Sequence, residues 1–166
     1  TWKKKGGKRC CYRNGRKLTG FQQIDGAWYY FNSKGVMCTG WQHIGNHYRY
    51  FSKKTGKMRV NTTIQGRKIN SKGIWTPVVV LDPGHTGVVA GGYEPLGPGS
   101  SEMKAKDTSG TEGIATGVAE YQLTLKVAKR LSTALKKQGC KVIMTRTNNK
   151  KALSCIQRTK IANRAK

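Results

Sequence analysis

One histidine and one glutamate carry the clearest chemistry in this sequence of 166 residues. His85 ends the segment DPGH, directly after the apolar run VVVL at 78–81, and Glu120 opens a stretch with helical spacing. A neutral imidazole nitrogen and a carboxylate oxygen are both accepted as ligands in hydrolytic zinc sites. A lone histidine after a strand is also a common loop residue, and the spacing by itself favours that simpler interpretation.

A strand–helix–strand unit would bring these two residues together. The apolar run at 78–81 predicts a strand buried on both faces, and KVIMT at 141–145 predicts a second strand. A right-handed crossover through a helix makes two such strands parallel, and a histidine at the carboxyl end of a parallel strand is well placed for chemistry. We therefore expect His85 and Glu120 to meet above the strand ends.

The helices and the long loop of this half follow from periodicity and glycine content. An amphipathic helix is expected from Glu120 to its stop at Gly139, and a second helix over 153–165. The first helix carries an apolar stripe at spacing four, formed by Leu123, Val127, Leu131 and Leu135. Residues 86–118 predict a long Gly-rich loop, of a length that compact domains usually keep for a functional reason.

Charge divides the chain into three parts. The 32 basic and 7 acidic residues give a net charge of +25, which excludes an acidic or neutral cytosolic enzyme. The balance is +16 over residues 1–76, −4 over 77–120 and +13 over 121–166. The acids of the central part either include groups that hold a cation or simply balance a basic surface, and charge alone favours the second interpretation. These acids are Asp82, Glu94, Glu102, Asp107, Glu112 and Glu120.

Other sequence features limit the class of protein further. No apolar run approaches the roughly 20 residues of a membrane-spanning helix, and no signal peptide is visible. The chain begins at Thr1 rather than Met, so we interpret it as a mature form or a fragment. The cysteines match neither a paired zinc motif nor an even disulfide framework, and we assign them no chemistry. They are Cys10, Cys11, Cys38, Cys140 and Cys155.

The first half of the chain is a repeat. TGFQQI at 19–24 returns as TGWQHI at 39–44, and the aromatic runs WYYF and YRYF follow in phase. The turn NSKG at 32–35 returns at 70–73. Each unit predicts a short β-hairpin whose apolar face cannot be buried alone, so stacked units predict a small β-solenoid with aromatic grooves.

This pattern resembles the cell-wall-binding, or choline-binding, repeats of surface proteins from Gram-positive bacteria, over residues 1–75. The resemblance implies that rings from successive repeats hold choline through cation–π attraction, or bind wall sugars. On it we place the ligand-binding grooves at Trp28, Tyr30, Trp41, Tyr48 and Tyr50. Phe31 and Phe51 are expected to form the hairpin core instead. Arg49 stands where a ring is expected, and a module this cationic should favour the phosphates of the wall polymer over choline.

The second half resembles the zinc-dependent N-acetylmuramoyl-L-alanine amidases of the Amidase_3 family. The motifs are VLDPGH at 80–85, GPGS at 97–100, KAKDTSG at 104–110, EYQLTL at 120–125, the strand ending in Arg146, and Arg158 with IAN at 161–163. The resemblance implies that His85 and Glu120 are zinc ligands and that the substrate is the amide bond between N-acetylmuramic acid and L-alanine in peptidoglycan. Asp82 is expected to orient the site rather than bind metal.

The resemblance also implies a second zinc-binding histidine and a general-base glutamate, and no residue of this chain matches either. We therefore expect a chain truncated within its catalytic domain, with weak zinc binding and little hydrolysis on its own. The glutamates and aspartates of the loop, Glu102, Asp107 and Glu112, remain alternative carboxylates.

The sequence thus predicts two domains: a β-hairpin repeat solenoid at 1–75, and an α/β domain at 77–166 with a partial parallel sheet and flanking helices. The expected function is a secreted, cell-wall-targeted peptidoglycan amidase that uses Zn²⁺ and contacts peptidoglycan and an anionic wall polymer. The alternative is a non-catalytic, cationic wall-binding protein. Nucleic-acid binding would rest on charge alone, without a reader motif, and ranks below both.

Overall fold

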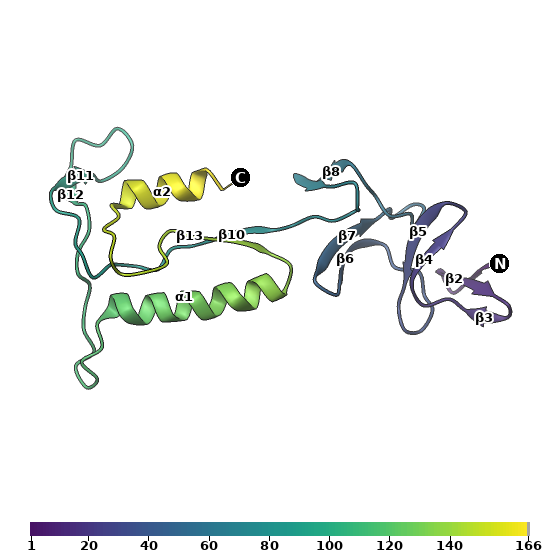
Figure 1. Ribbon diagram of the computed structural model, residues 1–166. Helices are drawn as coiled ribbons and strands as arrows, with labels where there is room; N and C mark the ends of the chain where they lie inside the picture. Colours follow the sequence, from purple (N-terminus) through teal and green to yellow (C-terminus); the bar gives the residue numbers. More distant parts are fainter. Residues whose placement is uncertain (166) are drawn as a thin grey trace. The chain divides into compact units, whose positions relative to one another are not determined.

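The structure is a computed structural model that describes residues 1–165 (Figure 1). Contacts between residues divide the chain into two compact units, Thr1–Thr76 and Pro77–Lys166, which we call the repeat unit and the α/β unit. Neither helix within the described residues is both long and apolar enough to span a bilayer.

The repeat unit consists of short antiparallel hairpins, as the repeats predict. Its strands are β1 (Trp2–Lys5), β2 (Lys8–Arg13) and β3 (Arg16–Lys17) in one sheet, then the pairs β4 (Gly20–Ile24) with β5 (Ala27–Phe31), β6 (Gly40–Ile44) with β7 (His47–Phe51), and β8 (Thr62–Ile64) with β9 (Arg67–Ile69). The turn between β4 and β5 places Asp25 and Gly26 at φ 49° and 73°. Two consecutive positive φ angles are what a tight two-residue hairpin turn requires, and Asp-Gly is among the residue pairs that adopt them most readily.

Buried phenylalanines join each hairpin to the next. Phe31 and Phe51 are both 0% exposed, so the prediction that they form the core is confirmed. The Phe31 ring lies 5.8 Å from that of Trp2, and the Phe51 ring lies 6.0 Å from that of Phe21. The hairpins β4–β5 and β6–β7 therefore each bury aromatic surface against the preceding unit, because a two-stranded hairpin is only marginally stable alone.

The α/β unit is built on two parallel strands, as predicted, but the strand at 78–81 is not buried on both faces, since Val78 is 41% exposed and the next three residues are half-buried. Strand β10 (Val78–Leu81) pairs with β13 (Lys141–Met144) from Val78↔Lys141 to Leu81↔Met144. The crossover between them contains α1 (Glu120–Lys137), and α2 (Cys155–Asn163) follows β13. The two helices lie on opposite sides of the strand pair (Figure 1). The second helix is shorter at both ends than the sequence suggests, and it begins after a capping box made by Ser154 and Gln157.

The apolar stripe of α1 is not its packed face. Leu123, Val127 and Leu131 are 54%, 55% and 45% exposed, whereas Leu125 and Ala128 are buried. Two strands cover only a narrow face of a helix. The face that they cover contains Leu125 and Ala128 and lies beside the apolar stripe. Periodicity identified the helix correctly but not the face that packs.

The loop between β10 and α1 is more ordered than predicted. Within residues 86–118 it contains β11 (Tyr93–Pro95) and β12 (Met103–Ala105), which pair antiparallel. Three-residue strands, one of them ending in proline, are too short to show an alternating pattern in the sequence. The prediction of a loop without secondary structure over this whole range is therefore wrong.

A buried carboxylate ties this hairpin to α2. Glu94 is 4% exposed and its Oε1 accepts a hydrogen bond from the Lys104 ammonium at 3.0 Å. Its Oε2 accepts from the backbone N–H of Ile156, in the first turn of α2, at 3.4 Å. Burial opposes ionisation of Glu94, but the hydrogen bonds from Lys104, Ser154 and Ile156 outweigh it and lower the pKa of this carboxyl.

Acid is therefore expected to loosen the contact between the β11–β12 hairpin and α2. Because the folded pKa of Glu94 lies below its ordinary value, its stabilisation is present at neutral pH and is lost as pH falls from about 5 towards the folded pKa. Glu94→Gln should lower the urea midpoint at neutral pH and flatten its dependence on pH in this acidic range. The matched control is Glu102→Gln, which changes an exposed acid of the same loop; equal effects of the two substitutions on urea unfolding would contradict the assignment.

Candidate active site

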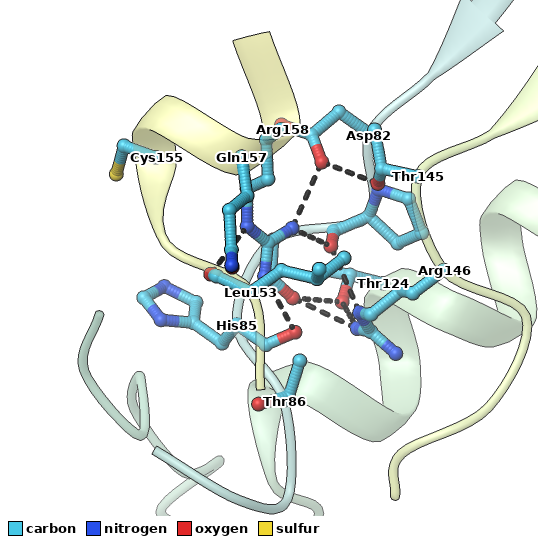
Figure 2. A network of polar contacts seen from close by, with 12 residues as sticks. Asp82, His85, Thr86, Thr124, Thr145, Arg146, Leu153, Cys155, Gln157 and Arg158 are labelled. Atoms are coloured by element: carbon cyan, nitrogen blue, oxygen red, sulfur yellow. Dashed lines mark hydrogen bonds and ion pairs between the residues drawn. The ribbon is translucent and has the colours of Figure 1, made fainter. Parts of the chain in front are cut away.

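The segment DPGH leaves β10 in a strained conformation. His85 has φ 57°, in the left-handed region that non-glycine residues rarely adopt. Such a conformation persists only where surrounding contacts hold it, and it occurs often at functional sites. Two buried arginines supply those contacts (Figure 2).

Arg146, which follows β13, binds the segment from one side. Its side chain is 5% exposed; Nε donates to the carbonyl of Pro83 at 3.0 Å, and Nη2 donates to the carbonyls of Gly84 and Tyr121, both at 2.9 Å. These bonds join the DPGH segment to the first turn of α1. Burial lowers the pKa of Arg146, and the neighbouring Arg158 cation lowers it further.

Arg158, on α2, binds the segment from the other side. It is 7% exposed, and its Nη1 donates to Asp82 Oδ1 and to the carbonyl of Pro83, each at 2.8 Å. Nη2 donates to the carbonyl of His85 at 3.4 Å. Asp82 also accepts from the Thr145 hydroxyl at 2.6 Å. Asp82 therefore helps to position the segment, in agreement with its expected orienting role.

The structure brings His85 and Glu120 together, as the strand–helix–strand arrangement predicts. His85 Nε2 lies 3.5 Å from Glu120 Oε1, with the two side chains 27% and 36% exposed. His85 Nδ1 lies 2.8 Å from the carbonyl of Thr108. A carbonyl can only accept, so Nδ1 carries the proton, and in the neutral ring Nε2 keeps its lone pair directed towards the carboxylate.

Glu120 is fixed by its other oxygen. Oε2 accepts from the backbone N–H of Thr111 at 3.0 Å and from the Thr111 hydroxyl at 2.9 Å. These two bonds lower the pKa of Glu120, with a smaller contribution from His85. Its place as the first residue of α1 also suits a negative charge, because the helix dipole is positive there. Oε1 thus belongs to an ionised carboxylate and faces His85 Nε2.

This pair of donor atoms fits zinc. Ligand distances of about 2.0–2.2 Å and a tetrahedral angle place two ligand atoms about 3.3–3.5 Å apart. The separation between His85 Nε2 and Glu120 Oε1 is 3.5 Å. The carbonyl on Nδ1 is also the usual outer partner of a metal-binding histidine. Over residues 1–165, however, no group of three or more His, Cys, Asp or Glu side chains is arranged to hold a metal.

The remaining carboxylates and thiols do not join the pair. Asp107 accepts a hydrogen bond from Thr86 at 3.4 Å, and Glu102 is exposed on the loop. Glu112 makes an isolated backbone bridge with Ala119. The cysteines Cys10, Cys11, Cys38, Cys140 and Cys155 are all free thiols.

A glycine makes room for the pair. A Cβ at Gly110 would lie 2.8 Å from His85 Cδ2 and 3.0 Å from Glu120 Oε2, and this residue has φ +78°. Gly110→Ala is therefore expected to push the imidazole and the carboxylate apart and to cost about 1–2 kcal/mol of stability for the left-handed backbone alone. The His85 ring resonances in an NMR spectrum would report the displacement. Gly91→Ala, where a Cβ meets nothing within 4 Å, should leave those resonances unchanged; a shift of equal size there would contradict the contact.

The arginine anchors were present in the sequence motifs without an assigned role. A hydrophobicity pattern cannot identify them, because a buried arginine looks like any other basic residue in a chain with 32 of them. The one indication of their role in the sequence is position: Arg146 directly follows the predicted strand at 141–145, and Arg158 lies within the predicted helix at 153–165.

The aromatic residues predicted to bind a wall ligand fall into two clusters. The Trp28 side chain, 40% exposed, lies against Phe21 with ring centroids 5.0 Å apart, and Tyr30 stacks on Phe51 at 6.2 Å. Trp41, Tyr48 and Tyr50 form the second cluster. The role of all five in ligand binding stays a prediction.

The second cluster gathers around a ring that the sequence reasoning missed. Trp75 lies 5.4 Å from Trp41 and 5.6 Å from Tyr48, and Trp41 lies 5.3 Å from Tyr50. The backbone N–H of Trp75 donates to the carbonyl of Tyr48. The repeat phase could have found it, since Trp75 stands two residues after the glycine of a turn, as Met37 and Met58 do.

Comparison with protein families gives two matches. The choline-binding repeat matches residues 18–62, and N-acetylmuramoyl-L-alanine amidase matches residues 79–166, which is more than half of the chain. No curated protein matches the chain.

Solved structures resemble the two halves separately. The choline binding domain of Spr1274 from Streptococcus pneumoniae is 36% identical over 45% of this chain and 92% of that chain, with a TM-score of 0.43. The N-acetylmuramyl-L-alanine amidase Ami1 from Mycobacterium smegmatis is 32% identical over 53% of this chain, with a TM-score of 0.47. The corresponding amidase from Mycobacterium abscessus is 33% identical, also with a TM-score of 0.47. This chain spans 41% and 42% of the lengths of these two amidases.

Proposed function

Because the chain belongs, through residues 79–166, to the N-acetylmuramoyl-L-alanine amidase family, we propose that it acts on the amide bond between N-acetylmuramic acid and L-alanine in peptidoglycan. The observation that carries this proposal is the 3.5 Å approach of His85 Nε2 to Glu120 Oε1 within the matched region. An imidazole nitrogen and an ionised carboxylate that face one point suit metal-assisted hydrolysis better than nucleophilic catalysis.

His85 and Glu120 are the residues that would hold zinc. When bound, zinc would acidify a water molecule and polarise the amide carbonyl. The chain's own contribution is orientation: the Thr108 carbonyl keeps the proton of His85 on Nδ1, and Thr111 holds Glu120 Oε2 so that Oε1 stays free. Two protein ligands are fewer than a catalytic zinc site normally keeps, so residues 1–165 should bind zinc weakly.

The repeat unit would direct this activity to the cell wall. The match to choline-binding repeats and the contacts between consecutive hairpins support a β-solenoid whose aromatic clusters, at Trp28, Tyr30, Trp41, Tyr48 and Tyr50, face the wall. A balance of 17 basic residues to one acid over residues 1–76 suits an anionic wall polymer. We place the protein outside the cell, as a secreted, wall-associated protein.

Turnover tests the proposal. Purified peptidoglycan is incubated with the full chain and added zinc, and newly exposed amino termini of L-alanine are counted. Glu120→Gln keeps the size of the side chain but removes its charge, and it should abolish any release. Release at the same rate from the Glu120→Gln chain, or no release at any zinc concentration, would leave the amidase proposal without support for this chain.

A non-catalytic wall-binding protein is the second candidate. The observation that favours it is the absence, over residues 1–165, of a third metal-binding side chain near His85 and Glu120. Sedimentation with purified cell walls across a salt series separates the modes of binding, since attachment by charge weakens as screening rises and attachment by aromatic grooves does not. Wall binding without turnover would identify this class.

A further inference from the structure

Three arginines of the repeat unit place their guanidinium groups over aromatic rings. Arg9 Cζ lies 5.3 Å from the Trp2 ring centroid, and Arg49 Cζ lies 5.2 Å from that of Phe21. The third, Arg67, has two such partners. A cation within about 6 Å of a ring face is attracted to it, so these rings already interact with a cation that the chain supplies.

Arg67 occupies the second aromatic cluster. Its Cζ lies 4.9 Å from the Trp75 centroid and 5.4 Å from that of Trp41, and those two rings are 5.4 Å apart. Gln65 Oε1 accepts hydrogen bonds from Arg67 Nη1 and from Trp41 Nε1, both at 3.3 Å. The guanidinium is therefore held at the rings by electrostatic attraction and by a shared amide oxygen.

No carboxylate neutralises these cations. Over residues 1–76 the one acid is Asp25, and every ion pair found among residues 1–165 lies in the α/β unit. One guanidinium nitrogen of Arg49, Nη1, is buried without a hydrogen-bond partner, and burial lowers the pKa of this guanidinium. The repeat unit therefore carries positive charge at its rings that no carboxylate of residues 1–76 offsets, and such a surface suits an anionic ligand.

We propose that the cluster of Arg67, Trp41 and Trp75 binds the phosphate groups of a wall polymer that carries phosphodiesters and no bases, and that it does not bind a quaternary ammonium. A second cation at rings that already face a guanidinium would be repelled. The guanidinium has five N–H donors in a planar fork that matches phosphate geometry, and Arg67 is only half-buried. The inference depends on the proposed function in one respect: wall targeting identifies the cell wall as the source of the polymer.

The same chemistry distinguishes this polymer from a nucleic acid. Single-stranded nucleic acids bind through bases that stack on open aromatic faces. At Trp41 and Trp75 a guanidinium lies over the rings, so a ligand without bases fits better.

The test uses the full chain and three probes: a glycerol phosphate oligomer, choline chloride, and a thymidine oligonucleotide with the same number of phosphates. Binding is followed at the indole N–H resonances of Trp41 and Trp75 by NMR and quantified by calorimetry. Arg67→Gln removes the charge but keeps a long polar side chain, and Arg67→Ala removes both. The matched control is Arg16→Ala, an exposed arginine of β3. Dispersed indole resonances confirm that each variant is folded.

The oligomer is expected to shift both indole resonances, with Arg67→Gln and Arg67→Ala weakening its binding about tenfold. Arg16→Ala should weaken it by no more than about twofold, through general electrostatics alone. Saturable binding of choline at Trp41 and Trp75, equal losses in the Arg67 and Arg16 variants, or tighter binding of the oligonucleotide than of the oligomer would each overturn the inference. These readouts are independent of amide cleavage and of sedimentation with whole walls.

Discussion

Replacing Arg146 by alanine is expected to unfold most of the α/β unit. The substitution leaves the carbonyls of Pro83, Gly84 and Tyr121 without their donor in a buried place. Leaving a buried polar group without its hydrogen-bond partner costs about 1–3 kcal/mol for each group. Summed over these carbonyls, that is a large fraction of the roughly 5–15 kcal/mol that stabilises a whole domain.

Urea unfolding of the full chain, followed by amide hydrogen exchange in α1 and β13, would measure this loss. Arg146→Lys keeps the charge but not the planar fork, and it should recover only part of the stability. Arg130→Ala removes an exposed arginine of α1 and should change stability by no more than about 0.5 kcal/mol. An Arg146→Ala chain that unfolds at the same urea concentration as the Arg130→Ala chain would show that the network does not hold the unit together.

Replacing His85 by alanine is expected to weaken zinc binding by at least about 100-fold. Changing even an outer partner of a metal ligand costs 10–100-fold in affinity, and His85 would be a ligand itself. The remaining Glu120 carboxylate cannot hold the ion alone, because its other oxygen is engaged by Thr111. Competition with a chromophoric zinc chelator in the full chain measures the affinity directly.

His47→Ala is the matched control for this measurement. His47 belongs to β7 in the repeat unit and not to the pair formed with Glu120, so its removal should leave zinc affinity unchanged. Equal zinc affinity of the native and His85→Ala chains, or equal losses in the two histidine variants, would mean that zinc binds elsewhere or only adventitiously.

The segments that the sequence predicted correctly are those whose structure depends on near neighbours. Each repeat has an aromatic run flanked by Gly-containing turns, which predicts a hairpin, and β4 and β5 form one around the tight turn at Asp25 and Gly26. The parallel strand pair was predicted in the same way, from the apolar run at 78–81, the helix that starts at Glu120 and the strand at 141–144. Because a crossover of this kind has one handedness, the approach of His85 to Glu120 followed from the same reasoning.

The errors lie where distant residues decide the outcome. Leu123, Val127 and Leu131 have the spacing of a packed face, yet the strands cover the neighbouring strip of α1 instead. The β11–β12 hairpin depends on Glu94, whose partner Ile156 lies 62 residues further along the chain. Neither feature has a local pattern that could reveal it.

The amino-acid sequence by itself determined the repeats, the strand–helix–strand order and the two residues best suited to a metal, since periodicity and turn chemistry are local properties. Only the tertiary structure decided what holds those residues in place. The buried forks of Arg146 and Arg158, the left-handed backbone of His85 and the position of Arg67 at two tryptophans each depend on side chains from separate elements. A basic residue has no periodic signature, and whether it is solvated or buried against a carbonyl is settled by the packing around it.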